Sequence, residues 1–281
     1  MFYLLTLFVS AQAGWLSSVN DALFHAINSL AGRSFVFDNL VDLAIESNLV
    51  KAALIGACFM FAWLAGGDPA VIARRRRILL VTLISSVFVV ACTKTLSKTI
   101  FLPRPFILSQ QTYHLEGNQL VETPRVEFNV PLDQENQKDY KDLLNGEVAD
   151  NDLGSFPSDH AGFYMTLALG IFLAYRRIGL IALGWTLFVT LGSRIITGEH
   201  SPLDVAVGSG VGIAILLSMQ FIFGNWAKRF IDPVVNWTMT NSALAAALLF
   251  VVLFETSNTL ENVRRVGHVG KDITKHLIGR E

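Results

Sequence analysis

Six long apolar runs, separated by polar turns, dominate the pattern of the chain. A helix that crosses a bilayer core about 30 Å thick needs roughly 20 mostly apolar residues. The runs that meet this requirement lie at about 47–66, 78–98, 160–175, 178–194, 204–224 and 234–254. Two of them, 160–175 and 178–194, are short, but each can extend into polar residues at one end. The pattern predicts an all-α fold, a polytopic membrane helix bundle with about six transmembrane helices.

The composition agrees with a membrane protein and excludes several other classes. Apolar residues make up 52% of the chain and charged residues 16%, whereas about a quarter of a soluble globular protein is charged. A formal net charge of −1 excludes a strongly basic nucleic-acid-binding protein. Cys58 and Cys92 both lie inside apolar runs, so we expect neither a disulfide framework nor a cysteine metal site.

Basic residues follow every second run, and this predicts how the bundle is oriented. Lys and Arg concentrate in short cytoplasmic loops. They follow the first, third and fifth apolar runs, at 74–77, 176–177 and 228–229. The segment 105–156 has an excess of Asp and Glu. We therefore expect the basic turns inside and the segments 99–159 and 195–203 on the extracytoplasmic (periplasmic) face of an inner or plasma membrane.

The remaining segments are assigned by composition. Residues 1–46 are predicted to form an N-terminal anchor or interfacial amphipathic region before a transmembrane domain at 47–257. Ala11-Gln12-Ala13 resembles a signal-peptidase site without the usual positive start, so we expect an uncleaved anchor rather than cleavage after Ala13. The segment 105–156 is predicted to be an extracytoplasmic insert. The polar tail 258–281 lies outside if 234–254 spans the membrane and inside if it re-enters.

Three polar clusters interrupt the apolar pattern, and all fall on the predicted outer face. They lie at 98–105, 156–160 and 193–204, at the outer ends of the second to fifth runs. Ionisable residues at membrane depth are energetically costly and therefore mark function. The clusters are spread over more than 100 residues of sequence, yet the topology brings them to one face. We expect them to form a single site.

The cations and the serine of these clusters suit an anion. Arg grips phosphate oxygens in a bidentate manner and Lys acts as a point charge, which makes Lys98, Arg104 and Arg194 candidate phosphate ligands. Ser158 stands at the predicted N-cap of the third run, where free N–H groups of a helix start can hold an anion. The pattern predicts a phosphate-binding pocket.

Two histidines in these clusters have different neighbours and therefore different predicted roles. His200 precedes Asp204 by four residues, so the carboxylate is expected to accept a proton from one imidazole nitrogen and leave the other as a nucleophile. His160 has no such carboxylate and suits a general acid that protonates the leaving oxygen. Glu199, beside His200, is expected at the rim of the site.

These residues resemble the motifs of the type 2 phosphatidic acid phosphatase (PAP2) superfamily, which read Lys-x6-Arg-Pro, Pro-Ser-Gly-His and Ser-Arg-x5-His-x3-Asp. The residues that match are Arg104 and Pro105 in the first motif, Pro157, Ser158 and His160 in the second, and Ser193, Arg194, His200 and Asp204 in the third. The resemblance covers about 78–224. It implies a helical membrane bundle and hydrolysis through a phosphohistidine, with no metal or other cofactor, in a pocket made by the Lys, both Arg and the Ser.

Two positions depart from these motifs. Five residues separate Lys98 from Arg104 where the motif has six, and Asp159 stands where the motif has Gly. A carboxylate beside a phosphate dianion repels it unless it points away, pairs with Arg104 or Arg194, or acts on a water. Similar Asp-containing motifs occur among bacterial undecaprenyl-diphosphate phosphatases, so the resemblance makes Asp159 a candidate site residue and favours that substrate.

The sequence therefore predicts an integral-membrane lipid phosphatase that acts at the outer leaflet. The expected partners are the bilayer and a lipid phosphate substrate, either undecaprenyl diphosphate or a phosphatidate-type lipid, and no nucleic acid. A lipid-to-lipid phosphotransferase with the same pocket, or a non-catalytic lipid transporter or binder of the same fold, remain alternatives. Neither the lipid nor the oligomeric state follows from the residues.

Overall fold

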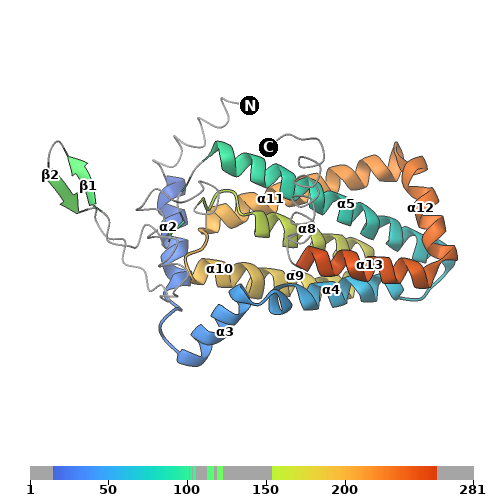
Figure 1. The fold of residues 1–281 in the computed structure, drawn as a ribbon, viewed down its shortest axis with the longest axis horizontal. Helices are drawn as coiled ribbons and strands as arrows, with labels where there is room; N and C mark the ends of the chain where they lie inside the picture. The colour runs from blue at the N-terminus through green and yellow to red at the C-terminus, as the bar shows by residue number, and fades with distance from the viewer. Residues whose placement is uncertain are drawn as a thin grey trace, which may run out of the picture.

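Apolar helices lie side by side along the long axis of the molecule in the computed structural model (Figure 1), which describes residues 15–100, 102, 104–105, 113–116, 119–122 and 154–257. The elements of this bundle are α4 (Asn48–Leu64), α5 (Pro69–Thr99), α8 (Asp159–Ala174), the continuous stretch α9 (Arg176–Trp185), η1 (Thr186–Leu191) and α10 (Gly192–Ile196), then α11 (Pro202–Asn225) and α13 (Ser242–Ser257). The prediction of an all-α membrane bundle is confirmed for this part of the chain.

The number of helices that can cross a membrane is smaller than predicted. By length and composition, Pro69–Ser97, Arg176–Ile196 and Pro202–Asn225 qualify alone, and two bent helix pairs raise the number to five within the described residues. With 16 residues, α8 is about 24 Å long and shorter than a bilayer core. Its polar start at Asp159 and the basic residues after Ala174 limit its length. The chain is a multi-pass membrane protein with three to five such spans in the described ranges, instead of about six.

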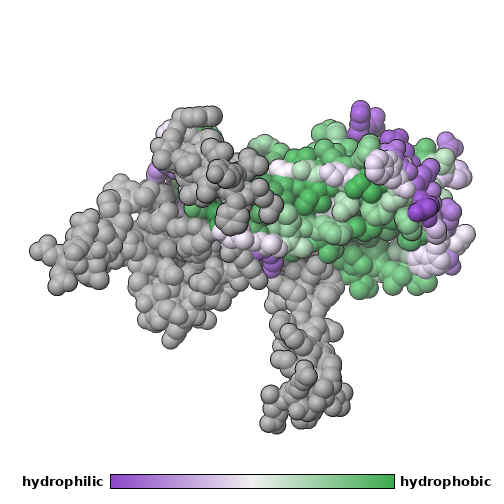
Figure 2. Space-filling model, turned by 90° about the horizontal axis from the view of Figure 1, so that it is seen from above, coloured by the Kyte–Doolittle hydropathy of each residue, from purple (hydrophilic) through white to green (hydrophobic). Residues whose placement is uncertain are grey.

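The predicted run 234–254 is two helices rather than one. It breaks at Asn241, where α12 (Lys228–Thr240) and α13 meet at an angle of 114°. In Figure 1, α12 lies across one end of the bundle and α13 runs back along it. Arg77 pairs with Asp232 of α12 at 2.6 Å, and Arg76 donates to the carbonyl of Thr238. Hydrophilic residues gather at this end, beside an apolar belt (Figure 2).

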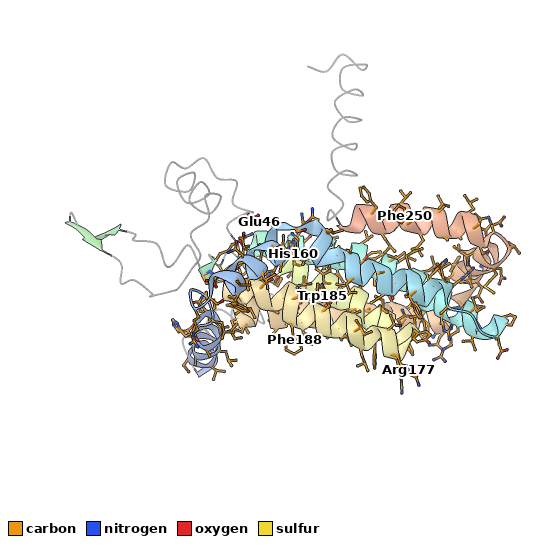
Figure 3. All side chains as sticks on the ribbon, turned by 90° about the horizontal axis from the view of Figure 1, so that it is seen from below. Glu46, His160, Arg177, Trp185, Phe188 and Phe250 are labelled. Atoms are coloured by element: carbon orange, nitrogen blue, oxygen red, sulfur yellow. The ribbon has the colours of Figure 1, made fainter. Side chains whose placement is uncertain are left out.

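The core of the bundle is apolar and closely packed. Phe59 and Trp63 of α4 are buried against Ile171 of α8 and its neighbours. On the outside, Phe188 and Phe250 point away from the bundle, with 81% and 63% of their surface exposed (Figure 3). Large exposed apolar side chains are expected where lipid, not water, is the solvent.

Two helices rather than one precede the bundle. They are α2 (Trp15–Asn28) and α3 (Phe35–Glu46), and α3 meets α4 at an angle of 70°. The Asn28 side chain donates to the carbonyl of Ile196 at 2.7 Å, and the Asn20 side chain accepts from the Leu203 N–H at 2.9 Å. The α2 helix thus supports the connection between α10 and α11. An interfacial role for residues 1–46 stays a prediction.

One antiparallel hairpin is described within the predicted 105–156 insert. It consists of β1 (Tyr113–Glu116) and β2 (Gln119–Glu122), with Tyr113 opposite Glu122. Apart from the hairpin, the described residues of the insert are 105 and 154–156. The expected uncleaved anchor at Ala13, the remaining residues of the insert and the tail 258–281 lie outside the described residues.

Candidate active site

Backbone hydrogen bonds bring the three polar clusters together at one end of the bundle. The Ser158 N–H donates to the carbonyl of Asp204 at 3.2 Å, which ties the start of α8 to the start of α11. The Ser155 N–H donates to the carbonyl of Leu102 at 2.8 Å, which adds the segment after α5. His160 lies toward this end of the bundle, and Arg177, from a basic turn, lies toward the other (Figure 3). The convergence that the sequence predicts is present.

Glycines allow α8 and α11 to approach backbone to backbone near this site. A Cβ added at Gly208 would stand 2.2 Å from the carbonyl oxygen of Ser158, and one at Gly212 would stand 2.4 Å from that of Gly162. Real Cβ atoms do not approach an oxygen so closely, so only glycine fits at these two positions. Since Ser158 caps α8 by accepting from the Ala161 N–H at 3.3 Å, this contact fixes the helix start that carries His160.

The connection from α10 to α11 folds back so that His200 faces α8. Gly198 turns the chain with φ of 77°, in the left-handed region that favours glycine. The His200 N–H then donates to the carbonyl of Arg194 at 3.1 Å. The π-helical segment η1 directly precedes α10, the short helix that carries Arg194, and the turn follows α10. Single π-helical turns are frequent at functional sites.

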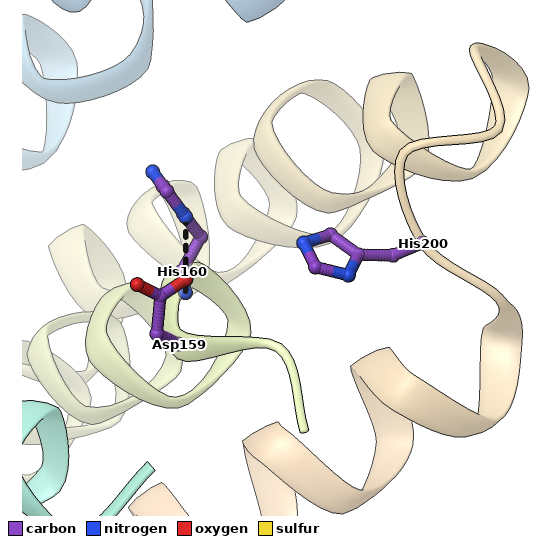
Figure 4. Close-up of side chains that lie close together, drawn as sticks. All are labelled: Asp159, His160 and His200. Carbon is purple, nitrogen blue, oxygen red and sulfur yellow. Dashed lines mark hydrogen bonds and ion pairs between the residues drawn. The ribbon is translucent and has the colours of Figure 1, made fainter. Parts of the chain in front are cut away.

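The two predicted catalytic histidines lie beside each other. One ligating atom from each of Asp159, His160 and His200 lies within 4.8 Å of the other two. Figure 4 shows the His200 ring projecting toward Asp159 and His160 from the opposite side of the site. His200 is 3% exposed, and the side chain of His160 is 23% exposed. Two imidazoles can therefore act on opposite sides of one phosphorus atom.

The partner of His200 fixes its tautomer. Its Nδ1 lies 2.9 Å from the carbonyl oxygen of Ser155, and since a carbonyl only accepts, Nδ1 carries the proton and Nε2 is free. Burial, followed by the nearby guanidinium groups of Arg194 and Arg104, holds the pKa of His200 well below its usual range. His200 is thus a neutral imidazole with an available Nε2, which is the state that a nucleophile requires.

Asp204 does not contact His200 in the described site as its spacing predicted. Its carboxylate instead accepts from the Ser201 N–H at 2.7 Å, while the Ser201 hydroxyl accepts from the Asp204 N–H at 3.2 Å, which is a capping box at the start of α11. Asp204 therefore fixes the backbone at Ser201, directly after His200, while the carbonyl of Ser155 holds the imidazole.

Asp159 takes up the histidine-carboxylate contact on the other side of the site. Its Oδ1 lies 2.7 Å from Nδ1 of His160 and also accepts the His160 N–H at 2.7 Å. Asp159 therefore does not form the ion pair considered for it with Arg104 or Arg194, but pairs with His160. The carboxylate orients the ring of His160, but burial and the nearby charge of Arg194 lower the pKa of His160 by more than the carboxylate raises it.

Arg104 and Arg194 flank the histidines and share one carboxylate, that of Glu199. Its Oε2 lies 2.5 Å from Nη1 of Arg104 and 3.7 Å from Nη1 of Arg194. The Nε atoms of both arginines are buried without a hydrogen-bond partner among the described residues. Buried guanidinium N–H groups without acceptors are costly, so an anion with several oxygens fits between them. Glu199 is part of the site rather than of its rim.

Sequence reasoning missed the cation Lys51, and the structure does not describe the side chain of the predicted cation Lys98. Lys98 lies in the last turn of α5, but its side chain is outside what the structure describes. Lys51 of α4 is only 8% exposed, and its charge interacts with those of Arg194, Glu199 and His160. The signal was a single Lys in the otherwise uncharged run 47–66.

Asp159, His160 and His200 are also a donor set that could hold a metal ion. Two imidazoles and a carboxylate suit zinc and similar ions. A cation at this point would break the Asp159–His160 hydrogen bond and would stand close to the charge of Arg194, which interacts with all three residues. The donor set alone therefore does not require a metal.

The sequence model of the PAP2 superfamily matches residues 76–227, more than half of the chain. Over 222 residues the chain is 26% identical to the undecaprenyl-diphosphatase BcrC of Bacillus subtilis (strain 168), covering 78% of this chain and 91% of that protein. Over 69 residues it is 41% identical to the bacitracin transport permease protein BcrC of Bacillus licheniformis, covering 25% of this chain and 32% of that protein. No solved structure matches the chain at a significant level.

Proposed function

The chain belongs to the PAP2 superfamily, and from this premise we propose that it hydrolyses the phosphate monoester or diphosphate headgroup of a membrane lipid through a phosphohistidine. The observation that carries the proposal is the pair His160 and His200 in one site with Arg104 and Arg194, whose buried Nε atoms have no hydrogen-bond partner among the described residues. The similarity to the Bacillus subtilis undecaprenyl-diphosphatase favours undecaprenyl diphosphate over a phosphatidate-type lipid.

The proposed reaction begins with attack by His200. Its Nε2 lone pair forms a bond to the terminal phosphorus, and the bond from phosphorus to the leaving oxygen breaks. His160, in its protonated form, donates the proton on its Nε2 to that oxygen, while its Nδ1 proton stays paired with the carboxylate. The lipid alcohol or lipid monophosphate therefore leaves with its oxygen protonated. Water then attacks the phosphohistidine, His160 takes up its proton, and inorganic phosphate is released.

Charge on the phosphoryl oxygens is stabilised by fixed cations. Arg104 and Arg194 offer buried N–H donors, and Lys98 is predicted to add a point charge. Such preorganised donors are the main source of rate enhancement in phosphoryl transfer. Asp159 orients the ring of His160, and Asp204 fixes the loop that carries His200 through its capping box with Ser201.

We place the site at the outer leaflet on the basis of charge. The basic turns contain Arg74–Arg77, Arg176 and Arg177, and Lys228 and Arg229, and Arg177 lies toward the end of the bundle away from His160 (Figure 3). If the basic turns are cytoplasmic, the site faces the other compartment. Cysteines placed near His200 that react with an impermeant reagent from the cytoplasmic side would contradict this placement.

The decisive experiment measures phosphate release from lipid phosphates by the purified full chain and its His200→Ala variant. We expect the variant to lose more than about a thousandfold of the activity, as for other enzymes that lose their nucleophile. His25→Ala, which removes an imidazole of α2 outside the site, is the matched control and should leave activity unchanged. Rapid quenching with labelled substrate should trap an acid-labile phosphoprotein in the control and none in His200→Ala. Wild-type-like turnover in His200→Ala would overturn the proposal.

The same assay separates hydrolysis from transfer and from transport. A lipid-to-lipid phosphotransferase releases little phosphate until an acceptor lipid is added. The name of the Bacillus licheniformis relative raises a transport function, and lipid flux without phosphate release in sealed vesicles would support that function instead.

A further inference from the structure

Lys51 is a buried cation without a close anion. Its side chain donates no hydrogen bond and has no acidic group within ion-pair distance among the residues that the structure describes, although it is 92% buried. Its charge interacts with the charges of Arg194, Glu199 and Glu46, and with His160. The Lys51 nitrogen is not among the fully buried atoms without a partner, so it is open to a ligand, and Glu199 is already held by Arg104 and Arg194. Lys51 therefore has the properties of a cation that waits for an anionic ligand.

The position of Lys51 is fixed by the helices around it. It lies in the first turns of α4, and the preceding residue, Val50, accepts a hydrogen bond at 3.0 Å from the indole N–H of Trp185. This contact ties the start of α4 to the helix that leads through η1 to Arg194. The lysine is thus held on the α4 side of the site.

A small apolar crevice, with a volume of about 10 Å³, lies next to the residue that follows Lys51. It runs between α4, α8 and α13, and Ala52, Gly56, Tyr164 and Leu253 are among its lining residues. Ala52 follows Lys51 directly, and the Tyr164 ring stacks on that of His160 with centroids 6.3 Å apart. A Cβ added at Gly56 would meet nothing within 4 Å, so there is open space at this point.

These features fall into the order of the parts of a lipid diphosphate. The arginines and His200 form the cradle for a terminal phosphate, His160 stands where the bridging oxygen would leave, and Lys51 lies near His160. We propose that the Lys51 ammonium binds the second, lipid-side phosphate of a diphosphate headgroup. This inference rests on the proposed function and narrows its substrate class to lipid diphosphates.

The chemical role of Lys51 follows from where charge develops. When His200 takes the terminal phosphoryl group, negative charge moves to the oxygen that stays on the lipid-side phosphate. A cation beside that phosphate stabilises the leaving group in the transition state. A lipid monophosphate has no second phosphate, so Lys51 contributes little to its hydrolysis. Lys51 is therefore a specificity-determining residue.

The test compares two substrates with the same tail, farnesyl diphosphate and farnesyl phosphate, in detergent micelles with the full chain. For Lys51→Met we expect kcat/KM for the diphosphate to fall by about tenfold or more, which is the range for loss of a charge-assisted contact. The value for the monophosphate should change by less than about threefold, and Lys51→Arg should keep most of the preference. An equal fall on both substrates, or no fall, would overturn the assignment.

Controls separate this role from a structural one. Arg76→Met removes another buried cation of the bundle, one that donates to Thr238 and lies over the ring of Trp63 at 5.1 Å, and it should leave the ratio of the two substrates unchanged. Replacing an unpaired buried cation by an apolar side chain of similar length is often neutral for folding. If the wild-type protein hydrolyses neither substrate, the proposed function fails, and not Lys51 alone.

One further measurement does not depend on Lys51→Met. Pyrophosphate should inhibit the wild-type protein at least about tenfold more strongly than phosphate, because it fills both anion positions, and equal inhibition would contradict the proposal.

Discussion

Replacing Glu199 by Gln should make the site bind phosphate-like anions more tightly. The carboxylate lies 2.5 Å from Arg104 and 3.7 Å from Arg194, and both guanidinium groups are predicted phosphate ligands. An incoming phosphate needs the same donors, so the carboxylate has to move aside or share them at a cost in repulsion. Glu199 thus competes with substrate and with the product, and its presence helps phosphate to leave.

The magnitude follows from the contact that Gln would weaken. A hydrogen bond between charged groups contributes about 1.5–3 kcal/mol, whereas a neutral amide oxygen contributes about 0.5–1.5 kcal/mol. The side chains of Arg104 and Glu199 are 21% and 14% exposed, so solvent weakens the contact and the lower part of the range applies. The difference is about 1–1.5 kcal/mol, which corresponds to roughly tenfold tighter binding of the anion.

The assay is inhibition of lipid phosphate hydrolysis by orthovanadate and by inorganic phosphate. In Glu199→Gln both inhibition constants should fall about tenfold, and a lower rate of product release should reduce kcat. Asp232→Asn is the matched control, because it breaks the comparable Arg77–Asp232 pair at 2.6 Å at the opposite end of the bundle, and its inhibition constants should stay at the wild-type values. Inhibition constants in Glu199→Gln that are unchanged, or higher than in the wild type, would refute the competition argument.

Three other substitutions or conditions follow from the geometry. Gly208→Ala puts a Cβ 2.2 Å from the Ser158 carbonyl and should lower the free energy of unfolding by about 1–3 kcal/mol. Thermal unfolding in detergent measures this change. In the control Gly210→Ala the new Cβ meets nothing within 4 Å, and the free energy of unfolding should not fall. Asp204→Asn should lose less activity than His200→Ala, because the Ser155 carbonyl still fixes the imidazole; an equal loss would show a direct role. Folding lowers the pKa of His200, so below about pH 6.5 the unfolded chain takes up a proton that the folded chain does not. The free energy of unfolding should therefore be unaffected by this group above that pH and should decline below it. His200→Gln should flatten this part of a stability–pH profile, and a slope unchanged from the wild type would argue against the shift.

The fold class and the convergence of the site were predictable because they depend on strong, local signals. Long apolar runs specify helices in a membrane, and the alternation of basic turns sends the polar clusters to one end. Ser158 caps α8 as its position before an apolar run indicated. Once the helix ends that carry His160 and His200 share one end of a bundle, the two imidazoles have few other places to go.

The predicted contact between His200 and Asp204 was wrong because it was inferred from their spacing alone. A separation of four residues places two side chains on one face only if both lie on the same helix. Here α11 begins at Pro202, with Ser201 as N-cap, so His200 lies in the loop before the helix. The Asp204 carboxylate turns back to the free N–H of Ser201, a local contact that forms with little loss of chain entropy. The carboxylate-histidine pair of the site is instead made by neighbours, Asp159 and His160.

Lys51 and Glu199 show a different limit of sequence reasoning. A lysine near the end of an apolar run usually extends its ammonium toward the membrane surface, and a glutamate beside a histidine has no pattern of its own. What separates these residues from ordinary interfacial charges is the contact of α4 with α9 and η1, made by Trp185 and Val50, and the fold of the 197–201 loop. Both depend on packing between distant segments, which are 135 residues apart for Trp185 and Val50 and 95 residues apart for Arg104 and Glu199. Charge in such a site therefore has to be counted on the assembled helices, because a single ionisable residue in an apolar run can complete an anion pocket whose other members belong to distant motifs.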